Sequence, residues 1–130
     1  MVIVDTCVWS EALRKQSNPE TEVATKLKKF ISDGQVVLLN PIRQELLSGI
    51  KEKKTFEKLK VQLRVFPGLH FEDEIYEIAA DCFNQCRKVG IQGSNTDFLI
   101  CAAAIHFDHF IFTTDQDFLF FKKQLPIKLI

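Results

Sequence analysis

Residues 1–9 read MVIVDTCVW, and this stretch decides the predicted fold. Val2, Ile3 and Val4 are consecutive apolar β-branched residues, a pattern typical of a strand buried on both faces of a parallel sheet. Asp5 follows directly, so its carboxylate stands at the carboxyl end of that strand, where open α/β sheets hold their functional sites. The opening stretch therefore predicts a central strand and the first residue of a site.

The composition is that of one folded domain covering residues 1–130. The chain is 46% apolar with 12 Phe, which suffices for a core without disulfides or metals at this length. The formal net charge is zero, which leaves open only a local patch for binding phosphates. No stretch is long and apolar enough to cross a membrane, and the N-terminus does not resemble a secretory signal. We therefore expect a cytoplasmic protein without a membrane segment.

The four cysteines all lie in apolar runs. They are Cys7, Cys82, Cys86 and Cys101. Cys82 and Cys86 are one helical turn apart, but no second pair of Cys or His has zinc-site spacing. We expect all four to be reduced, buried and small hydrophobic residues of the core.

Strands and amphipathic helices alternate along the rest of the chain. Apolar runs predict strands over 36–39, 110–112 and 127–130, and residues 65–71 predict a short strand with a turn. Helices are expected over 6–14, 19–33, 41–48, 51–64, 72–89, 97–105 and 118–121. Asn18 is expected to cap the second helix, with Pro19 at its first position. This order predicts a three-layer α/β/α sandwich around a central, mainly parallel sheet of four to five strands.

Three further acids lie near predicted element ends. Glu45 is about one helical turn beyond the second strand, Asp97 lies in the first turn of an apolar helix, and Asp115 follows the strand over 110–112. We expect these acids and Asp5 to come from four separate strand-to-helix connections and to converge at one edge of the sheet. Each acid alone is explained as a surface or capping residue, but the set is less easily explained in that way.

Converging carboxylates have a defined chemistry. They repel one another, and a divalent cation removes that cost. Oxygen ligands without His or Cys favour Mg²⁺ or Mn²⁺ over zinc, and such ions are usually completed by water and by substrate phosphates. A bound ion of this kind activates water for attack on phosphorus. The residues therefore predict metal-dependent hydrolysis of phosphodiesters.

The predicted helix over 51–64 is rich in basic residues, with six Lys or Arg against two Glu. One interpretation is an ordinary solvated helix face. The other is a surface that contacts a phosphate backbone. The charge of the segment does not decide between them.

Four segments together resemble the PIN-domain ribonucleases, specifically the toxin subunits of VapBC-type toxin–antitoxin pairs. They are VDTCVW at 4–9, ELLSG at 45–49, DFLICAA at 97–103 and TTDQDF at 113–118. Each motif alone is a weak signal, but the four follow the family's order and span the whole chain. Cys101 departs from the pattern, because a small residue such as Ala is frequent at that position.

The resemblance implies a catalytic site and a reaction. The implied catalytic and metal-binding residues are Asp5, Glu45, Asp97 and Asp115. They are expected to bind Mg²⁺ or Mn²⁺ and to position the attacking water, with Asp117 as an auxiliary ligand. Thr6 and Thr113 either hydrogen-bond the carboxylates or the substrate, or serve only as turn residues. The expected reaction is endonucleolytic cleavage of RNA, which leaves a 3′-hydroxyl and a 5′-phosphate without a covalent intermediate.

The resemblance also implies partners. We expect a homodimer that forms a heterotetramer or a larger assembly with a cognate VapB-like antitoxin. The antitoxin's C-terminal segment would block the acidic site, often with an Arg that competes with the metal. Trp9 and the phenylalanines either line that groove or pack in the core, and the core is favoured for most of the Phe.

Two alternatives to an active nuclease remain open. A receiver-type phospho-acceptor domain also has an acidic pocket, but it needs an acidic neighbour for Asp5 and a Lys after the last strand. A PIN-like binding domain that has lost catalysis would need no acid set. Alanine at Asp5 or Asp97 separates the cases, because it abolishes the cellular effect of a nuclease but not that of a scaffold.

Overall fold

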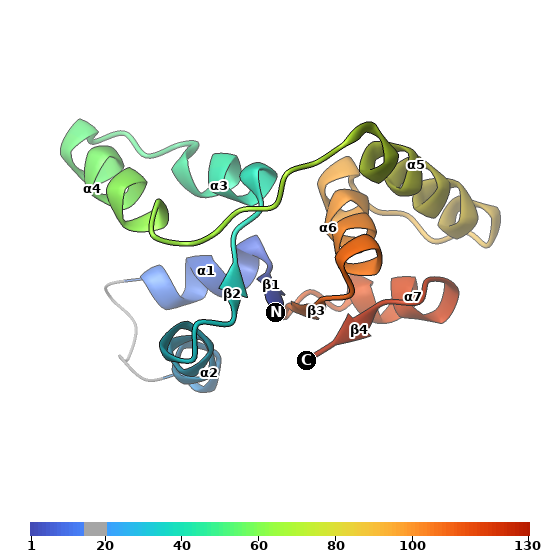
Figure 1. Ribbon diagram of the computed structural model, residues 1–130, viewed down its shortest axis with the longest axis horizontal. Coiled ribbons are helices and arrows are strands. Elements are labelled where there is room, and N and C mark those ends of the chain that lie inside the picture. The colour runs from blue at the N-terminus through green and yellow to red at the C-terminus, as the bar shows by residue number, and fades with distance from the viewer. Residues whose placement is uncertain (15–20) are drawn as a thin grey trace.

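The computed structural model describes residues 1–14 and 21–130 (Figure 1). The strands are β1 (Val2–Val4), β2 (Val36–Val37), β3 (Phe110–Phe112) and β4 (Lys128–Leu129). The helices are α1 (Thr6–Leu13), α2 (Glu22–Ser32), α3 (Asn40–Leu47), α4 (Lys53–Leu63), α5 (Asp73–Lys88), α6 (Asn95–Phe107) and α7 (Asp117–Gln124). The predicted cap at Asn18 and Pro19 lies outside the described residues. Thr21 caps α2, where its hydroxyl accepts the N–H of Ala24 at 3.0 Å.

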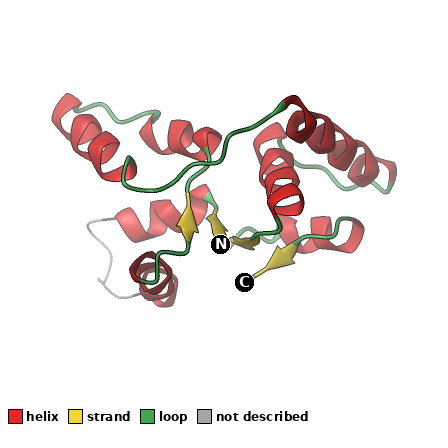
Figure 2. Ribbon diagram, in the orientation of Figure 1, coloured by secondary structure: helices red, strands yellow, loops and turns green. Residues whose placement is uncertain are grey.

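The strands form one parallel sheet in the order β2-β1-β3-β4. The opening strand is central: Val2 pairs with Val36 on one side and with Phe110 on the other. The connection from β1 to β2 runs in one direction along the sheet, and those from β2 to β3 and from β3 to β4 run in the other. Because parallel crossovers are right-handed, opposite directions place helices on opposite faces. This arrangement is the predicted α/β/α sandwich (Figure 2).

The core lies around β1, β3 and α6. Val2–Val4 are all buried, as expected for a strand covered on both faces. Helix α6 is apolar nearly all round, and its residues 100–104 are buried in one unbroken run. In Figure 1, α3 and α4 lie above the sheet toward the left, and α6 and α5 lie above it toward the right. The carboxyl end of β1 is therefore flanked by helices from two distant parts of the chain.

The predicted strand at 65–71 is wrong, and the one at 36–39 is shorter than expected. Residues 64–72 form an irregular connection that runs between α4 and α5 (Figure 1). Among the described residues, one backbone hydrogen bond links this connection to the segment after β2, from the N–H of Leu38 to the carbonyl of Pro67 at 2.9 Å. Pro67 has no N–H to return a second bond, so no ladder forms there. Leu38 and Leu39 are fully buried without being part of a strand.

The cysteine prediction is confirmed at three positions and wrong at one. Cys82, Cys86 and Cys101 are buried and unpaired. Burial raises the pKa of the Cys82 thiol to about 11, and it also raises the pKa of the Cys86 and Cys101 thiols. Cys7 is only half-buried, because it lies on the first turn of α1 beside polar groups. Across the described part of the chain, no helix combines the length and the apolar character that a membrane span requires.

Candidate active site

Asp5 is the anchor of the candidate site. It follows β1 and caps α1, where its Oδ1 accepts the backbone N–H of Thr6 at 2.7 Å. Its own N–H donates to the carbonyl of Phe112 at 2.9 Å, which ties it to the end of β3. Its exposed fraction is 7%, and among the described residues it is the one charged residue in the buried class. A buried carboxylate is costly unless donors surround it, so the groups around Asp5 need an explanation.

Glu45 reaches this region from α3. The hydroxyl of Thr6 donates to Glu45 Oε2 at 2.5 Å, across 39 residues of chain. Thr6 therefore places one carboxylate beside another, since its backbone N–H bonds Asp5 while its side chain bonds Glu45. This is one of the two roles expected for Thr6, a hydrogen bond to a carboxylate.

Thr113 and Asp115 come from the loop that follows β3. The hydroxyl of Thr113 donates to Asp5 Oδ2 at 2.8 Å and accepts the N–H of Asp115 at 3.0 Å. Asp115 Oδ1 in turn accepts the N–H of Asp117, at 2.9 Å, at the start of α7. Thr113 therefore also hydrogen-bonds a carboxylate, and it joins the loops after β1 and β3.

Asp117 stands apart from this group. Its side chain is exposed, and it borders a cavity of about 230 Å³ together with Gln92 and Phe120. Thr113 and Asp115 border a different cavity, of about 120 Å³. The link between Asp117 and the other acids is its backbone bond to Asp115, so its role as an auxiliary ligand stays a prediction.

Asp97 approaches from the start of α6. Ser94 caps this helix and accepts the N–H of Asp97 at 3.0 Å, while the Asp97 carboxylate accepts the N–H of Ser94 at 3.0 Å. Burial raises the pKa of Asp97 above its ordinary value, the two bonds with Ser94 lower it, and the charges of Asp5 and Asp115 raise it further. Asp97 therefore lies close enough to Asp5 and Asp115 to feel both charges.

The expectation that each acid follows a strand is wrong for Asp97. The element before α6 is helix α5, not a strand. Asp97 is instead brought to the sheet edge by the packing of α6 against β3 and α5. The charges of Asp5 and Asp115 thus act on Asp97, and hydrogen bonds join Glu45 to Asp5 through Thr6 and Asp115 to Asp5 through Thr113.

The chemistry of these groups suits a hard divalent cation, because every nearby side chain except one thiol offers oxygen. Their spacing in the structure is more open than that of a finished metal site. Within residues 1–14 and 21–130, no three acidic, His or Cys side chains are grouped closely enough to hold a metal ion. Hydroxyls and N–H groups currently satisfy the carboxylates, so a metal ion stays a prediction.

Two residues of this region were missed by the sequence argument. Cys7 was assigned to the core, yet its Sγ lies 3.5 Å from Asp5 Oδ2 and is half-buried. Ser94 was one of several possible caps in a polar turn, and the structure makes it the partner of Asp97. The sequence position of Cys7 could have indicated this contact, because Cys7 lies two residues after Asp5 in the first turn of α1.

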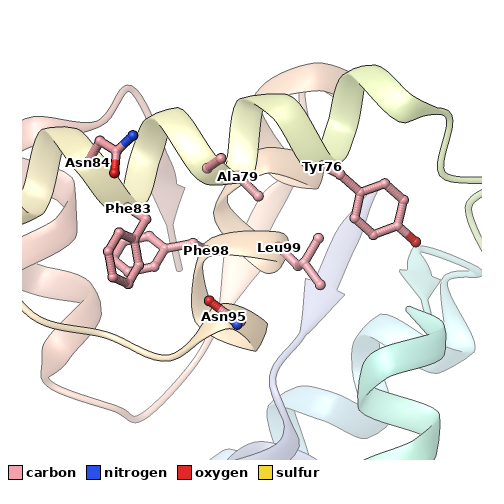
Figure 3. A pocket seen from close by; sticks show the side chains of 8 residues that line it. Tyr76, Ala79, Phe83, Asn84, Asn95, Phe98 and Leu99 are labelled. Atoms are coloured by element: carbon pink, nitrogen blue, oxygen red, sulfur yellow. The ribbon is translucent and has the colours of Figure 1, made fainter.

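A separate cavity of about 410 Å³ lies between α5 and α6 (Figure 3). Tyr76 and Phe83 line it from α5, and Phe98 and Leu99 line it from α6. Its lining contains no acidic side chain, although Leu99 lies only two residues from Asp97. This cavity is therefore distinct from the carboxylate group.

The chain belongs to the PIN domain family, whose model matches residues 2–123. It is 29% identical over 122 residues to ribonuclease VapC11 of Mycobacterium tuberculosis and, at the same identity, to VapC ribonuclease Mb1587 of Mycobacterium bovis. The alignments cover 91% of this chain and 89% of each relative. The resemblance seen in the four motifs is thereby confirmed at the level of the family.

Solved structures share the fold. FitAcB from Neisseria gonorrhoeae matches with a TM-score of 0.75 at 22% identity, covering 100% of this chain and 96% of that one. VapBC2 from Rickettsia felis, bound to a DNA fragment from its promoter, matches with a TM-score of 0.78 at 19% identity, covering 100% and 98%. At these identities the likeness establishes the fold, and the predicted PIN-like architecture is confirmed.

Proposed function

We propose that this chain is a metal-dependent endoribonuclease that acts as the toxin of a type II toxin–antitoxin pair. The observation that carries the proposal is the hydrogen-bond network that joins Asp5 to Glu45 through Thr6 and to Asp115 through Thr113, with Asp97 near enough for the charges of Asp5 and Asp115 to raise its pKa. Membership of the PIN family and relatives named as ribonucleases support the choice of RNA as substrate. The receiver-type alternative loses its basis with this family membership.

The side chains divide the work between holding charge and fixing geometry. Asp5, Glu45, Asp97 and Asp115 would hold the cation, with Asp117 as an auxiliary group. Bound Mg²⁺ or Mn²⁺ would activate a water and stabilise charge on the phosphate. Thr113 orients Asp5 by its 2.8 Å bond, and Thr6 orients Glu45 by its 2.5 Å bond. Hydrolysis in this site leaves a 3′-hydroxyl and a 5′-phosphate and needs no covalent intermediate.

A cavity of about 630 Å³ between α1, α3 and α4 suits the antitoxin partner. Leu13, Leu46 and Leu59 are among its apolar lining residues, and Arg14 and Lys58 add positive charge to the lining. Helix α1 begins at Thr6 and α3 carries Glu45, so a segment laid in this cavity reaches the acidic group by following either helix. Trp9 is not available to such a segment, because it is 3% exposed and packs edge-on against Phe66 at 5.1 Å.

The proposed assembly is a homodimer of this chain that binds a VapB-like antitoxin. The neighbours in fold include complexes named FitAB and VapBC2, which supports a partner of this kind. Light scattering on the purified chain measures the homodimer directly.

Cleavage of a pool of structured RNAs tests the function. Purified protein is incubated with the pool in Mg²⁺ or Mn²⁺, and the controls are EDTA and the Asp97→Asn variant. Asp97→Asn keeps an oxygen that can accept the Ser94 N–H, so it removes charge without removing the cap. We expect cuts that require metal and that disappear in both controls, with 5′-phosphate ends.

The negative outcomes are also informative. Cuts that persist in both EDTA and Asp97→Asn would contradict the proposed site. An absence of cuts in all RNAs, together with no binding of Mn²⁺ to the wild-type protein, would favour the scaffold alternative, because the proposed hydrolysis requires a bound metal ion to activate water.

A further inference from the structure

We propose that Cys7 is a positioning residue, whose thiol links the carboxylate of Asp5 to the loop after β3. Its effect on catalysis rests on the proposed nuclease function, whereas its effect on the conformation of Asp5 does not. The thiol is half-buried and has three polar contacts. One is with the carboxylate of Asp5, and the other two are with the hydroxyls of Thr113 and Thr114, which lie more than 100 residues further along the chain.

The contacts of the thiol connect the first and fourth motifs. Cys7 Sγ lies 3.5 Å from Asp5 Oδ2 and 3.6 Å from the hydroxyl of Thr113. The hydroxyl of Thr114 donates to the same sulfur at 3.3 Å, across 107 residues of chain. The sulfur therefore lies at the point where the loops after β1 and β3 meet.

The available protons give the network one direction. Thr113 has a single hydroxyl proton, and its bond of 2.8 Å to Asp5 Oδ2 uses it. The S–H of Cys7 donates to Asp5 Oδ2, and the hydroxyl of Thr114 donates to the sulfur. The thiol of Cys7 and the hydroxyl of Thr113 therefore both donate to Oδ2 of Asp5, and together they fix the position of that oxygen.

This arrangement accounts for how Asp5 is held. Its Oδ1 accepts from Thr6 and its Oδ2 accepts from Thr113 and Cys7, so donors engage both oxygens of a carboxylate that is 7% exposed. A thiol is a weak donor, but it is also the acceptor for Thr114. Losing it removes one restraint on Asp5 and one restraint on the loop that carries Asp115.

The other three cysteines show that this role is particular to Cys7. Cys82, Cys86 and Cys101 lie in the core at 3%, 0% and 0% exposure, where burial accounts for them as small apolar residues. Cys7 has an exposed face and polar partners, so packing alone does not explain its position. Cys86→Ala is the matched control, because it removes a thiol from the core on α5, where burial alone raises its pKa and no described hydrogen bond links it to Asp5.

The test compares Cys7→Ser, Cys7→Ala and Cys86→Ala with the wild-type protein. Serine keeps a side chain that can donate and accept a hydrogen bond. Alanine has no such group, but it is compatible with helix α1. The first readout is the ¹³C signal of the Asp5 carboxyl group in metal-free protein, which needs neither RNA nor a bound ion. The second readout is the single-turnover rate of RNA cleavage and the RNA concentration that gives half of the maximal rate.

We expect Cys7→Ala to shift the Asp5 signal and to lower the maximal rate about tenfold without changing the half-saturating concentration, as fits the loss of one hydrogen bond to a charged group. Cys7→Ser and Cys86→Ala should remain near wild type in both readouts. An unmoved Asp5 signal in Cys7→Ala, an unchanged rate, or a Cys7→Ser variant as slow as Cys7→Ala would overturn the proposal. If wild-type protein cleaves no RNA, the nuclease proposal fails, and the Asp5 signal alone still decides whether the thiol positions Asp5.

Discussion

At the scale of single residues, Asp97 shows the conflict between charge and stability. Burial and the charges of Asp5 and Asp115 raise the pKa of Asp97, although the bonds with Ser94 oppose the shift. A raised pKa in the folded state means that folding favours the protonated acid. The stability linked to this group is therefore complete at low pH and is lost as pH rises through the folded pKa.

We predict that Asp97→Asn is more stable than the wild type at pH 7 in the absence of metal. The amide has no charge to desolvate or to be repelled, and it can still accept the Ser94 N–H. The difference in unfolding free energy should close as the pH falls below about 4, where an ordinary Asp is protonated. Urea unfolding of both proteins from pH 3 to pH 8 measures it. A variant that is less stable at every pH would show that the Asp97 carboxylate stabilises the fold and that its charge is not a cost to stability.

At the scale of elements, the start of α6 joins a helix cap to a site carboxylate. Ser94 and Asp97 form a reciprocal capping box, so the residue that caps the start of the helix also positions the acid. Thr21 caps α2 with the same geometry, since its hydroxyl also accepts an N–H at 3.0 Å, but it lies in a different part of the fold. The two caps therefore form a natural pair for comparison.

We predict that Ser94→Ala and Thr21→Ala cost similar stability but differ in activity. Each removes one cap, for which about 1 kcal/mol is expected. Only Ser94→Ala loosens the turn that carries Asp97, so only this variant should cleave RNA more slowly. Thermal unfolding and single-turnover cleavage measure the two effects. Equal losses of rate in both variants would indicate that the rate follows global stability and not the position of Asp97.

At the scale of the whole molecule, a neutral chain carries an uneven distribution of charge. Helix α4 is basic, and it packs against α3, which carries Glu45. Lys60 is paired with Glu57 at 2.7 Å, but Lys53, Lys54 and Lys58 have no ion pair in the described part of the structure. These three lysines are exposed and give α4 a positive surface, and α4 lies beside α3, the helix of a proposed catalytic acid (Figure 1).

We predict that replacing Lys53, Lys54 and Lys58 together by Gln weakens RNA binding. Each lost phosphate contact should lower the slope of log affinity against log salt by about 0.7 on single-stranded RNA. Salt titrations of RNA binding measure the slope. The matched control replaces Lys88, Lys122 and Lys123 by Gln, which removes the same charge from α5 and α7. Equal effects of both triple variants would point to net charge and not to a surface on α4.

Local patterns in the chain predict much of this architecture. The run Val2–Val4 is a buried β-strand because its apolar β-branched residues suit both faces of a sheet, and in the strand at 110–112 Ile111 and Phe112 are buried while Phe110 is exposed. Asp5 follows β1 directly and Asp115 lies three residues after the end of β3, so their location at one sheet edge is a consequence of parallel pairing. The order of the four motifs likewise indicates the family, which the match over residues 2–123 confirms.

Packing between distant segments decides the rest. The bond of Thr6 to Glu45 spans 39 residues, and that of Thr114 to Cys7 spans 107, so no local period encodes either. Asp97 reaches the site from a connection between two helices, because α6 packs on β3. Local apolar spacing predicts which residues are buried and in which element. It does not predict which polar groups meet at an edge, since that depends on how crossovers fold helices over the sheet, and this is why Cys7 was assigned to the core.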